Sequence, residues 1–197
     1  MDHAAAAHGS DEHVEKFERA RFGMWLFLAS EIMFFSGFIG AYVVLRMANP
    51  HLATAGQEIL SWPLAAVNTA VLIVSSLTMV MAVHHISKGN RGKCEDMIFV
   101  TAVLGTIFLV IKGFEYAAKF GHTPAITPHT STFWSSYFLM TGFHGLHVLG
   151  GIVALVFLLF YVKNYGPDRY AKVENVALYW HFVDLVWIFL FPIVYLL

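Results

Sequence analysis

Five long apolar segments constrain this sequence more than any other feature. They lie at residues 22–45, 62–86, 96–116, 133–162 and 174–197. A transmembrane α-helix needs about 20 predominantly apolar residues to cross the hydrocarbon core of a bilayer, and each segment reaches that length. Inside hydrocarbon every backbone N–H and C=O must be bonded within the protein, which an α-helix achieves alone. The sequence therefore predicts an all-α, polytopic membrane protein, a bundle of five transmembrane helices.

Composition supports this class and excludes several others. Hydrophobic residues make up 58% of the chain and charged residues 13%, which is too apolar for an ordinary soluble domain. The net charge of -1 gives no support for a nucleic-acid partner. The single cysteine, Cys94, excludes an internal disulfide framework and a cysteine-ligated metal cluster within this chain.

Residues 1–21 form a polar N-terminal tail, and residues 22–197 form the transmembrane domain. We expect the tail to lack fixed structure, because it is polar and lies at the chain terminus. Lys and Arg are concentrated in the tail and in the connections on the same side of the bundle, and cytoplasmic segments carry such an excess. We therefore expect a cytoplasmic N-terminus and an outward C-terminus. The cations on the inner side are Lys16, Arg19, Arg21, Lys88, Arg91, Lys93, Lys163, Arg169 and Lys172, against Arg46 and Lys119 on the other.

The first apolar segment contains a carboxylate, Glu31, about nine residues from its start. At roughly 1.5 Å of rise per residue, this places Glu31 about 13 Å deep, near the middle of the bilayer. An ionisable group at that depth suggests a function. The alternative is a protonated Glu that only fixes helix packing. Gly37 and Gly40, beside Ser36, provide small residues for close contact with another helix.

The fourth segment contains TGFHGLHVLGG, in which two imidazoles interrupt an apolar run. His144 and His147 lie on one stripe of a helix, and Gly142 and Gly145 open an adjoining face for another helix. Unpaired polar groups facing lipid are costly, so both histidines are expected to face protein or water.

Two more polar pairs have helical spacing. His181 and Asp184 are i, i+3 neighbours, so the carboxylate can accept from the imidazole, and Lys112 and Glu115 have the same spacing. The pair His144 and His147 and the pair His181 and Asp184 lie at depths that would let them meet Glu31 inside one bundle.

Three kinds of chemistry remain open on these residues alone. His144 or His147 together with His181 are candidate ligands of a bis-histidine haem. A proton path or transporter is a second possibility, and a purely structural polar core is the third. The sequence contains no phosphate-binding loop, nucleophile elbow or HExxH motif, so hydrolase or kinase chemistry has no support.

Four segments resemble subunit III of haem-copper terminal oxidases. They are RFGMWLFLASEIMFFSGF at 21–38, GFEY at 113–116, STFWSSYFLMTGFHGLHVLGG at 131–151 and YWHFVDLVWIFLF at 179–191. The segment TGFHGLHV resembles subunit III of cytochrome c oxidases more closely than that of quinol oxidases. Nitric oxide reductase accessory proteins are also similar.

The resemblance implies an accessory subunit of cytochrome c oxidase with no catalytic residue, metal, haem or copper of its own. In that family, electrons from cytochrome c reduce O₂ to water with proton pumping in subunits I and II, which carry haem and copper. Subunit III packs mainly against subunit I, holds phospholipid and supports proton uptake. The implied location is the inner (plasma) membrane, in contact with subunit II and further membrane subunits. An independent membrane haem protein or proton-coupled transporter is the alternative from another class.

The resemblance also implies roles for single residues. Glu31 matches the buried carboxylate of the family's SE-x-x-FF motif, where it would support proton uptake or lie beside lipid or subunit I. The other matching polar positions would form a network inside the subunit; they are Glu115, His144, His147, His181 and Asp184. Long members of the family have seven spans, and this chain resembles them from the third onward. The lipid-holding cleft is therefore expected to be absent or completed by a neighbouring subunit.

Overall fold

The computed structural model describes residues 2–51, 59–121, 126–161 and 171–196, with side chains described from residue 18 onward. Its long helices are α1 (Asp2–Ala48), α3 (Trp62–Ser87), α4 (Arg91–Phe120), α5 (Thr132–Tyr161) and α6 (Ala171–Phe191). A π-helical turn, η3 (Pro192–Leu196), continues α6. Over these residues the structure contains no strand.

Within the described residues, five helices are long and apolar enough to cross a membrane, as the sequence predicted. They cover Glu18–Ala48, Trp62–Ser87, Arg91–Phe120, Thr132–Tyr161 and Ala171–Leu196. The span predicted at 96–116 is longer at both ends. Its start is capped by Asn90, whose side chain accepts from the Lys93 backbone N–H at 3.3 Å. The all-α, five-helix membrane fold is confirmed.

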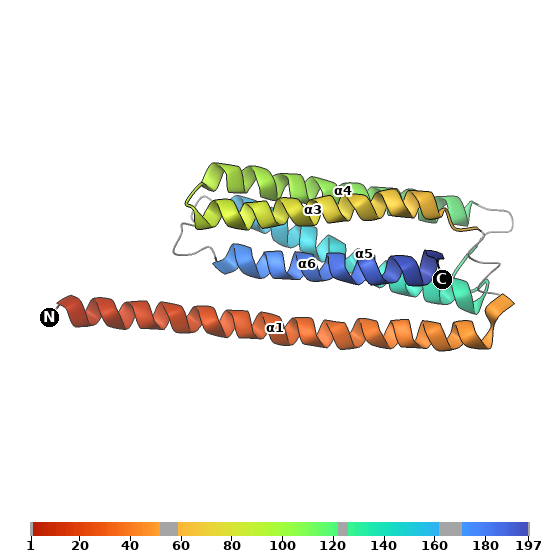
Figure 1. Cartoon of the computed structure of the whole chain (residues 1–197), viewed down its shortest axis with the longest axis horizontal. Coiled ribbons are helices and arrows are strands. Elements are labelled where there is room, and N and C mark those ends of the chain that lie inside the picture. The colour runs from red at the N-terminus through yellow and green to blue at the C-terminus, as the bar shows by residue number, and fades with distance from the viewer. Residues whose placement is uncertain (1, 52–58, 122–125, 162–170, 197) are drawn as a thin grey trace.

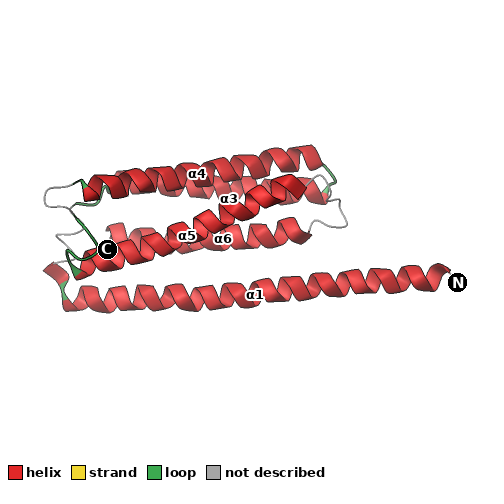
Figure 2. Ribbon diagram, turned by 180° about the vertical axis from the view of Figure 1, so that it is seen from behind, coloured by secondary structure: helices red, strands yellow, loops and turns green. Residues whose placement is uncertain are grey.

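Helices α3, α4, α5 and α6 form a bundle, and α1 lies along one side of it (Figures 1 and 2). Within the bundle, α3 packs against α4 and α6, and α5 packs against α4 and α6. Helix α1 packs against α5 and α6. The N-terminal part of α1 projects beyond the ends of the other helices (Figure 1).

The expectation of a tail without fixed structure is wrong for residues 2–21, which belong to α1. This segment contains four consecutive alanines, Ala4–Ala7, and the helix formers Glu12, Glu15 and Lys16. Once a helix has been nucleated by the adjoining membrane span, each added residue costs little. The helix therefore continues toward the N-terminus past the apolar segment.

Two buried tryptophans of α6 hold the bundle together. The indole N–H of Trp180 donates to Ser75 Oγ at 3.1 Å, and that of Trp187 donates to Thr69 Oγ1 at 2.9 Å. Both rings are at most 1% exposed. Since the acceptors lie on α3, these bonds connect α6 to α3 through side chains that also fill the core.

The glycines that permit close packing differ from those predicted. A Cβ added at Gly105 would lie 2.5 Å from Trp180 Cη2, and one at Gly151 would lie 2.8 Å from the same ring. By contrast, a Cβ at Gly37 or Gly40 would meet no described atom within 4 Å. The prediction that these two glycines pack against another helix is therefore not met within this chain, because that face of α1 points away from the bundle.

Gly142 and Gly145 are an intermediate case. An added Cβ would lie 3.9 Å from Tyr116 Oη at Gly142 and 3.9 Å from Leu109 Cδ2 at Gly145. These are ordinary van der Waals distances. Both glycines face α4, but their contacts are looser than the contacts of Gly105 and Gly151 with the Trp180 ring.

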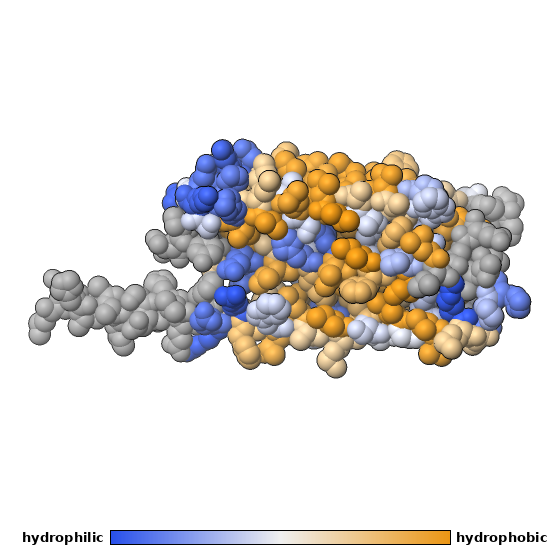
Figure 3. Space-filling view, in the orientation of Figure 1, coloured by the Kyte–Doolittle hydropathy of each residue, from blue (hydrophilic) through white to orange (hydrophobic). Residues whose placement is uncertain are grey.

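The outer surface matches a lipid environment. Hydrophobic residues cover much of the middle of the bundle, and hydrophilic residues gather toward its ends (Figure 3). Large apolar side chains such as Met33, Phe114 and Phe160 are more than 70% exposed. Exposure on this scale is costly in water but not in hydrocarbon.

We predict that Gly105→Ala destabilises the bundle by about 1–3 kcal/mol, because the added methyl group overlaps the Trp180 ring. Thermal unfolding in mild detergent, followed by circular dichroism, measures the change. Gly113→Ala on the same helix is the matched control, since a Cβ there meets no described atom within 4 Å. Equal unfolding temperatures for the two variants would contradict the assigned packing.

Candidate functional site

Polar and ionisable side chains inside the bundle are the candidates for function, because such groups are rare and costly in hydrocarbon. The structure places the predicted ones in separate locations. The expectation that the histidine pairs and Glu31 meet in one network is wrong: of these residues, only His147 hydrogen-bonds to Glu31.

Glu31 and His147 form a pair between α1 and α5. His147 Nε2 lies 3.0 Å from Glu31 Oε2, and His147 Nδ1 lies 2.8 Å from the Phe143 carbonyl oxygen. Each side chain of the pair is 18% exposed. The Tyr179 hydroxyl of α6 donates to the His147 carbonyl at 3.0 Å, so three helices meet at this point.

The bonding of His147 determines how many protons the pair holds. A carbonyl oxygen only accepts, so His147 Nδ1 must carry a hydrogen to bond Phe143. The Nε2–Oε2 bond then requires one further proton, either on the Glu31 carboxyl or on the imidazole. The pair is neutral overall in both forms, which suits a site in the middle of the membrane. The contact therefore joins α1 to α5 through a hydrogen bond without leaving a net charge in hydrocarbon.

His144 faces a different part of the core from His147. Three residues correspond to 300° of helical rotation, so the two imidazoles diverge by about 60°. The His144 ring is fully buried and stacks on Trp187, with ring centroids 4.9 Å apart. Neither ring nitrogen has a hydrogen-bond partner among the described residues. His144 therefore packs as an aromatic side chain.

Glu115 is the centre of a buried charged cluster, defined here as Lys112, Glu115, Lys119, Tyr137 and Tyr195. Lys112 Nζ donates to Glu115 Oε2 at 2.8 Å. Lys119, Tyr137 and Tyr195 donate to Oε1 at 2.8, 2.9 and 2.8 Å. Lys112 also donates to the Tyr195 hydroxyl. The carboxylate accepts four bonds and joins α4, α5 and η3.

The charged cluster contains two ammonium groups and one carboxylate. The additional positive charge lies against aromatic faces: Lys112 Nζ is 4.6 Å from the Trp187 ring centroid, and Lys119 Nζ is 4.8 Å from that of Tyr137. Such cation–π contacts stabilise a desolvated ammonium group. The i, i+3 spacing predicted the contact of Lys112 with Glu115, but the other members of the cluster were not predicted. The i, i+4 spacing of Glu115 and Lys119 was a signal for one of them; nothing local indicated Tyr137 or Tyr195.

His181 and Asp184 both face α3, but they do not bond to each other. His181 Nδ1 lies 2.6 Å from Ser76 Oγ on α3. Asp184 is 4% exposed, and neither of its carboxyl oxygens has a hydrogen-bond partner in the described part of the chain. The predicted i, i+3 bond is absent because the imidazole directs Nδ1 toward Ser76 of α3 instead of toward the carboxylate one turn along its own helix.

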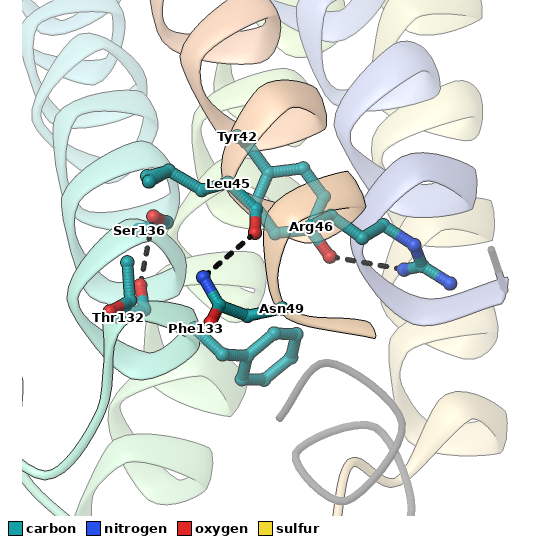
Figure 4. Close-up of a pocket in the computed structure, with 7 residues that line it drawn as sticks. All are labelled: Tyr42, Leu45, Arg46, Asn49, Thr132, Phe133 and Ser136. Carbon is teal, nitrogen blue, oxygen red and sulfur yellow. Dashed lines mark hydrogen bonds between the residues drawn. The ribbon is translucent and has the colours of Figure 1, made fainter. Parts of the chain in front are cut away.

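A small pocket lies where α1 ends beside the start of α5 (Figure 4). Arg46 donates to the Tyr42 hydroxyl at 3.3 Å, and the Ser136 hydroxyl donates to the Thr132 carbonyl at 2.9 Å. The cavity volume is only about 10 Å³, which is room for about one water molecule. Across the described ranges, no three His, Cys, Asp or Glu residues are grouped to hold a metal ion.

Comparison with known proteins gives a consistent result. The family model for cytochrome c oxidase subunit III matches residues 4–197. A probable cytochrome c oxidase subunit 3 from Nocardia farcinica is 39% identical over 176 residues, covering 88% of this chain and 85% of that protein. A probable quinol oxidase subunit 3 from Staphylococcus haemolyticus is 30% identical over 189 residues, covering 95% and 93%. A probable quinol oxidase subunit 3 from Staphylococcus aureus is 29% identical over 189 residues, covering 95% of this chain and 93% of that protein.

We predict that Glu115→Gln destabilises the bundle by about 3–5 kcal/mol, because it leaves two buried ammonium groups without their carboxylate. The midpoint of thermal unfolding in detergent measures the loss. Asp96→Asn is the control, since it makes the same charge change at an exposed position of α4. If both variants unfolded at the same temperature, the charged cluster would not support the fold as described.

Proposed function

Because the chain belongs to the cytochrome c oxidase subunit III family, we propose that it is the non-redox accessory subunit III of a respiratory haem-copper oxidase that couples O₂ reduction to proton pumping. The observation that carries this proposal is the family match over residues 4–197. The described fold, five membrane-spanning helices with polar groups paired inside them, suits a subunit that works within a larger membrane complex.

We further propose cytochrome c as the electron donor of the complex. The Nocardia relative, named a probable cytochrome c oxidase subunit 3, is 39% identical to this chain, against 30% for the Staphylococcus haemolyticus protein, named a probable quinol oxidase subunit 3. The quinol oxidase alternative rests on the longer alignment of the second protein.

We propose that haem and copper are held by partner subunits I and II. The bonding of the inward-facing histidines supports this. His147 uses both ring nitrogens, and His181 directs Nδ1 to Ser76. The His144 nitrogens have no partner among the described residues, but that ring is fully buried against Trp187 and faces no open space. A haem ligand needs a free nitrogen directed across an open space between helices, so these contacts argue against a haem within this bundle.

The proposed role of the subunit is to stabilise subunit I and to support proton uptake. Glu31 is the residue to which we assign the second role, because its pair with His147 holds a proton and is partly exposed on the flank where α1 meets the bundle. The outward face of α1, including Gly37 and Gly40, has no partner among the described residues. We propose that subunit I or phospholipid contacts this face. The cation count favours a plasma membrane orientation with the N-terminus in the cytoplasm.

Purification in mild detergent through an N-terminal tag tests the proposed assembly. We expect haem- and copper-bearing subunits to copurify, and we expect dissociation of this chain to remove no chromophore from them. Oxidase turnover should continue after dissociation but decay sooner. Oxidation rates with reduced cytochrome c and with a quinol distinguish the donors.

Two results would overturn the assembly. In one, the chain purifies alone with a haem absorption band; in the other, it purifies alone and colourless. Faster turnover with quinol than with cytochrome c would reverse the donor assignment and leave the accessory role intact.

Glu31→Gln tests the proton role. The glutamine amide can donate to His147 Nε2, so the hydrogen bond and the position of α1 are retained while the exchangeable acid proton is lost. We expect oxidase turnover to fall several-fold and its pH dependence to change. Asp96→Asn provides the control for a charge change at an exposed site. Unchanged turnover and pH profile in Glu31→Gln would leave Glu31 with a packing role only.

A further inference from the structure

A groove runs along the contact between α3 and α6, at the end of the bundle where α3 ends and α6 begins. Its volume is about 390 Å³. Its polar lining consists of His84 and Ser87 from α3 and Glu174 and His181 from α6, between aliphatic side chains. This end carries Lys88, Arg91 and Lys93, and such an excess of cations favours the cytoplasmic side.

Polar groups become more buried along the groove. His84 and Ser87 are exposed, Glu174 and His181 are partly buried, and Asp184 is buried. On α6, spacings of seven and three residues keep Glu174, His181 and Asp184 on one face of the helix. Ten residues separate Glu174 from Asp184, which corresponds to about 15 Å along the helix axis. The groove therefore leads from a membrane surface toward a carboxyl group well inside the bundle.

Ser76 connects the inner end of the groove to Asp184. Its Oγ lies 2.6 Å from His181 Nδ1. The Ser76 hydroxyl also lies beside the Asp184 carboxyl, although neither carboxyl oxygen makes a hydrogen bond to any described residue. A buried carboxyl group without a partner is costly. Asp184 thus has unused capacity to bind a proton at the end of a polar path.

We propose that α3 and α6 form a proton half-channel in which the groove, His181 and Ser76 connect one membrane surface to Asp184, a proton-binding residue. A proton from water in the groove adds to His181 Nε2, and the proton on Nδ1 passes to Ser76 Oγ. Ser76 passes its own hydroxyl proton to Asp184, which becomes a neutral carboxylic acid. Reversal of these steps returns the proton, so no other reactant is needed.

Asp184 makes no ion pair or hydrogen bond with a charged group in the described chain. The neighbouring helices direct other titratable groups toward α6, but these groups do not lie at Asp184. They lie against Tyr179, against Trp187 or at the mouth of the groove. They are Glu31 of α1, His84 of α3, Lys112 of α4, and His144 and His147 of α5. The proton-accepting group at the inner end is therefore the Asp184 carboxyl itself.

This inference goes beyond the proposed oxidase role and does not depend on it, because a proton-binding carboxyl can be detected without oxidase turnover. The test is infrared spectroscopy of the full chain, purified in mild detergent together with any subunits that accompany it. A carboxylic-acid C=O band that is lost in Asp184→Asn belongs to Asp184. Transfer from H₂O to D₂O then gives the rate at which its proton exchanges.

We expect Asp184 to contribute such a band and to exchange its proton rapidly. His181→Phe and Ser76→Ala should slow that exchange on the order of a hundredfold, the lower range of what a positioned proton-transfer group contributes. Ser75→Ala is the matched control. It removes a hydroxyl from the neighbouring position, where Ser75 bonds Trp180 and is not on the path.

Two outcomes would overturn the half-channel. One is the absence of any carboxylic-acid band that Asp184→Asn removes, at every pH at which the protein stays folded. The other is an exchange rate that is the same in the wild type, Ser76→Ala and Ser75→Ala. If Ser76→Ala did not fold, the comparison of His181→Phe with the wild type would decide the question.

Discussion

The absence of water from hydrocarbon is the constraint on which this structure depends, because a polar side chain inside the bundle can find a partner only within the protein. The indoles of Trp180 and Trp187 meet this requirement through hydroxyl groups on α3. Glu115 meets it through two lysines and two tyrosines. These contacts bond α6 to α3 and connect α4, α5 and η3, so the polar partners fix the arrangement of the four-helix bundle.

Helix α1 is held to this bundle in a different way. It packs on α5 and α6 only along one flank, where Glu31 bonds His147 and the ring of Phe35 lies 5.1 Å from that imidazole. The opposite face of α1 carries small and apolar residues with no partner in the described chain. This arrangement leaves one face of α1 available to other components of a membrane complex, as the proposed accessory role requires.

The two locations that we propose to bind protons lie on different sides of α6. The Glu31–His147 pair shares one proton between an acid and an imidazole. Asp184 has no described hydrogen-bond partner and lies at the end of a polar groove between α3 and α6. The charged cluster around Glu115 differs from both, because each of its polar groups already has a hydrogen-bond partner and its lysines lie against aromatic rings. Only the first two locations are therefore part of the proposals on proton transfer.

The sequence by itself determined the five helices, the membrane class and the family. The length of the apolar segments and the order of the motifs can be read directly from the sequence. In hydrocarbon, a segment of that length has few alternatives to an α-helix, because its backbone groups must be hydrogen-bonded within the protein. Spacing along one helix also predicted the contact of Lys112 with Glu115. The tertiary structure alone decided that Gly105 and Gly151 receive Trp180 and that His147, not His144, meets Glu31. It also decided that Asp184 has no hydrogen-bond partner among the described residues. These features depend on how each helix is rotated about its axis against its neighbours, which the packing of distant side chains sets and the spacing within one helix does not encode.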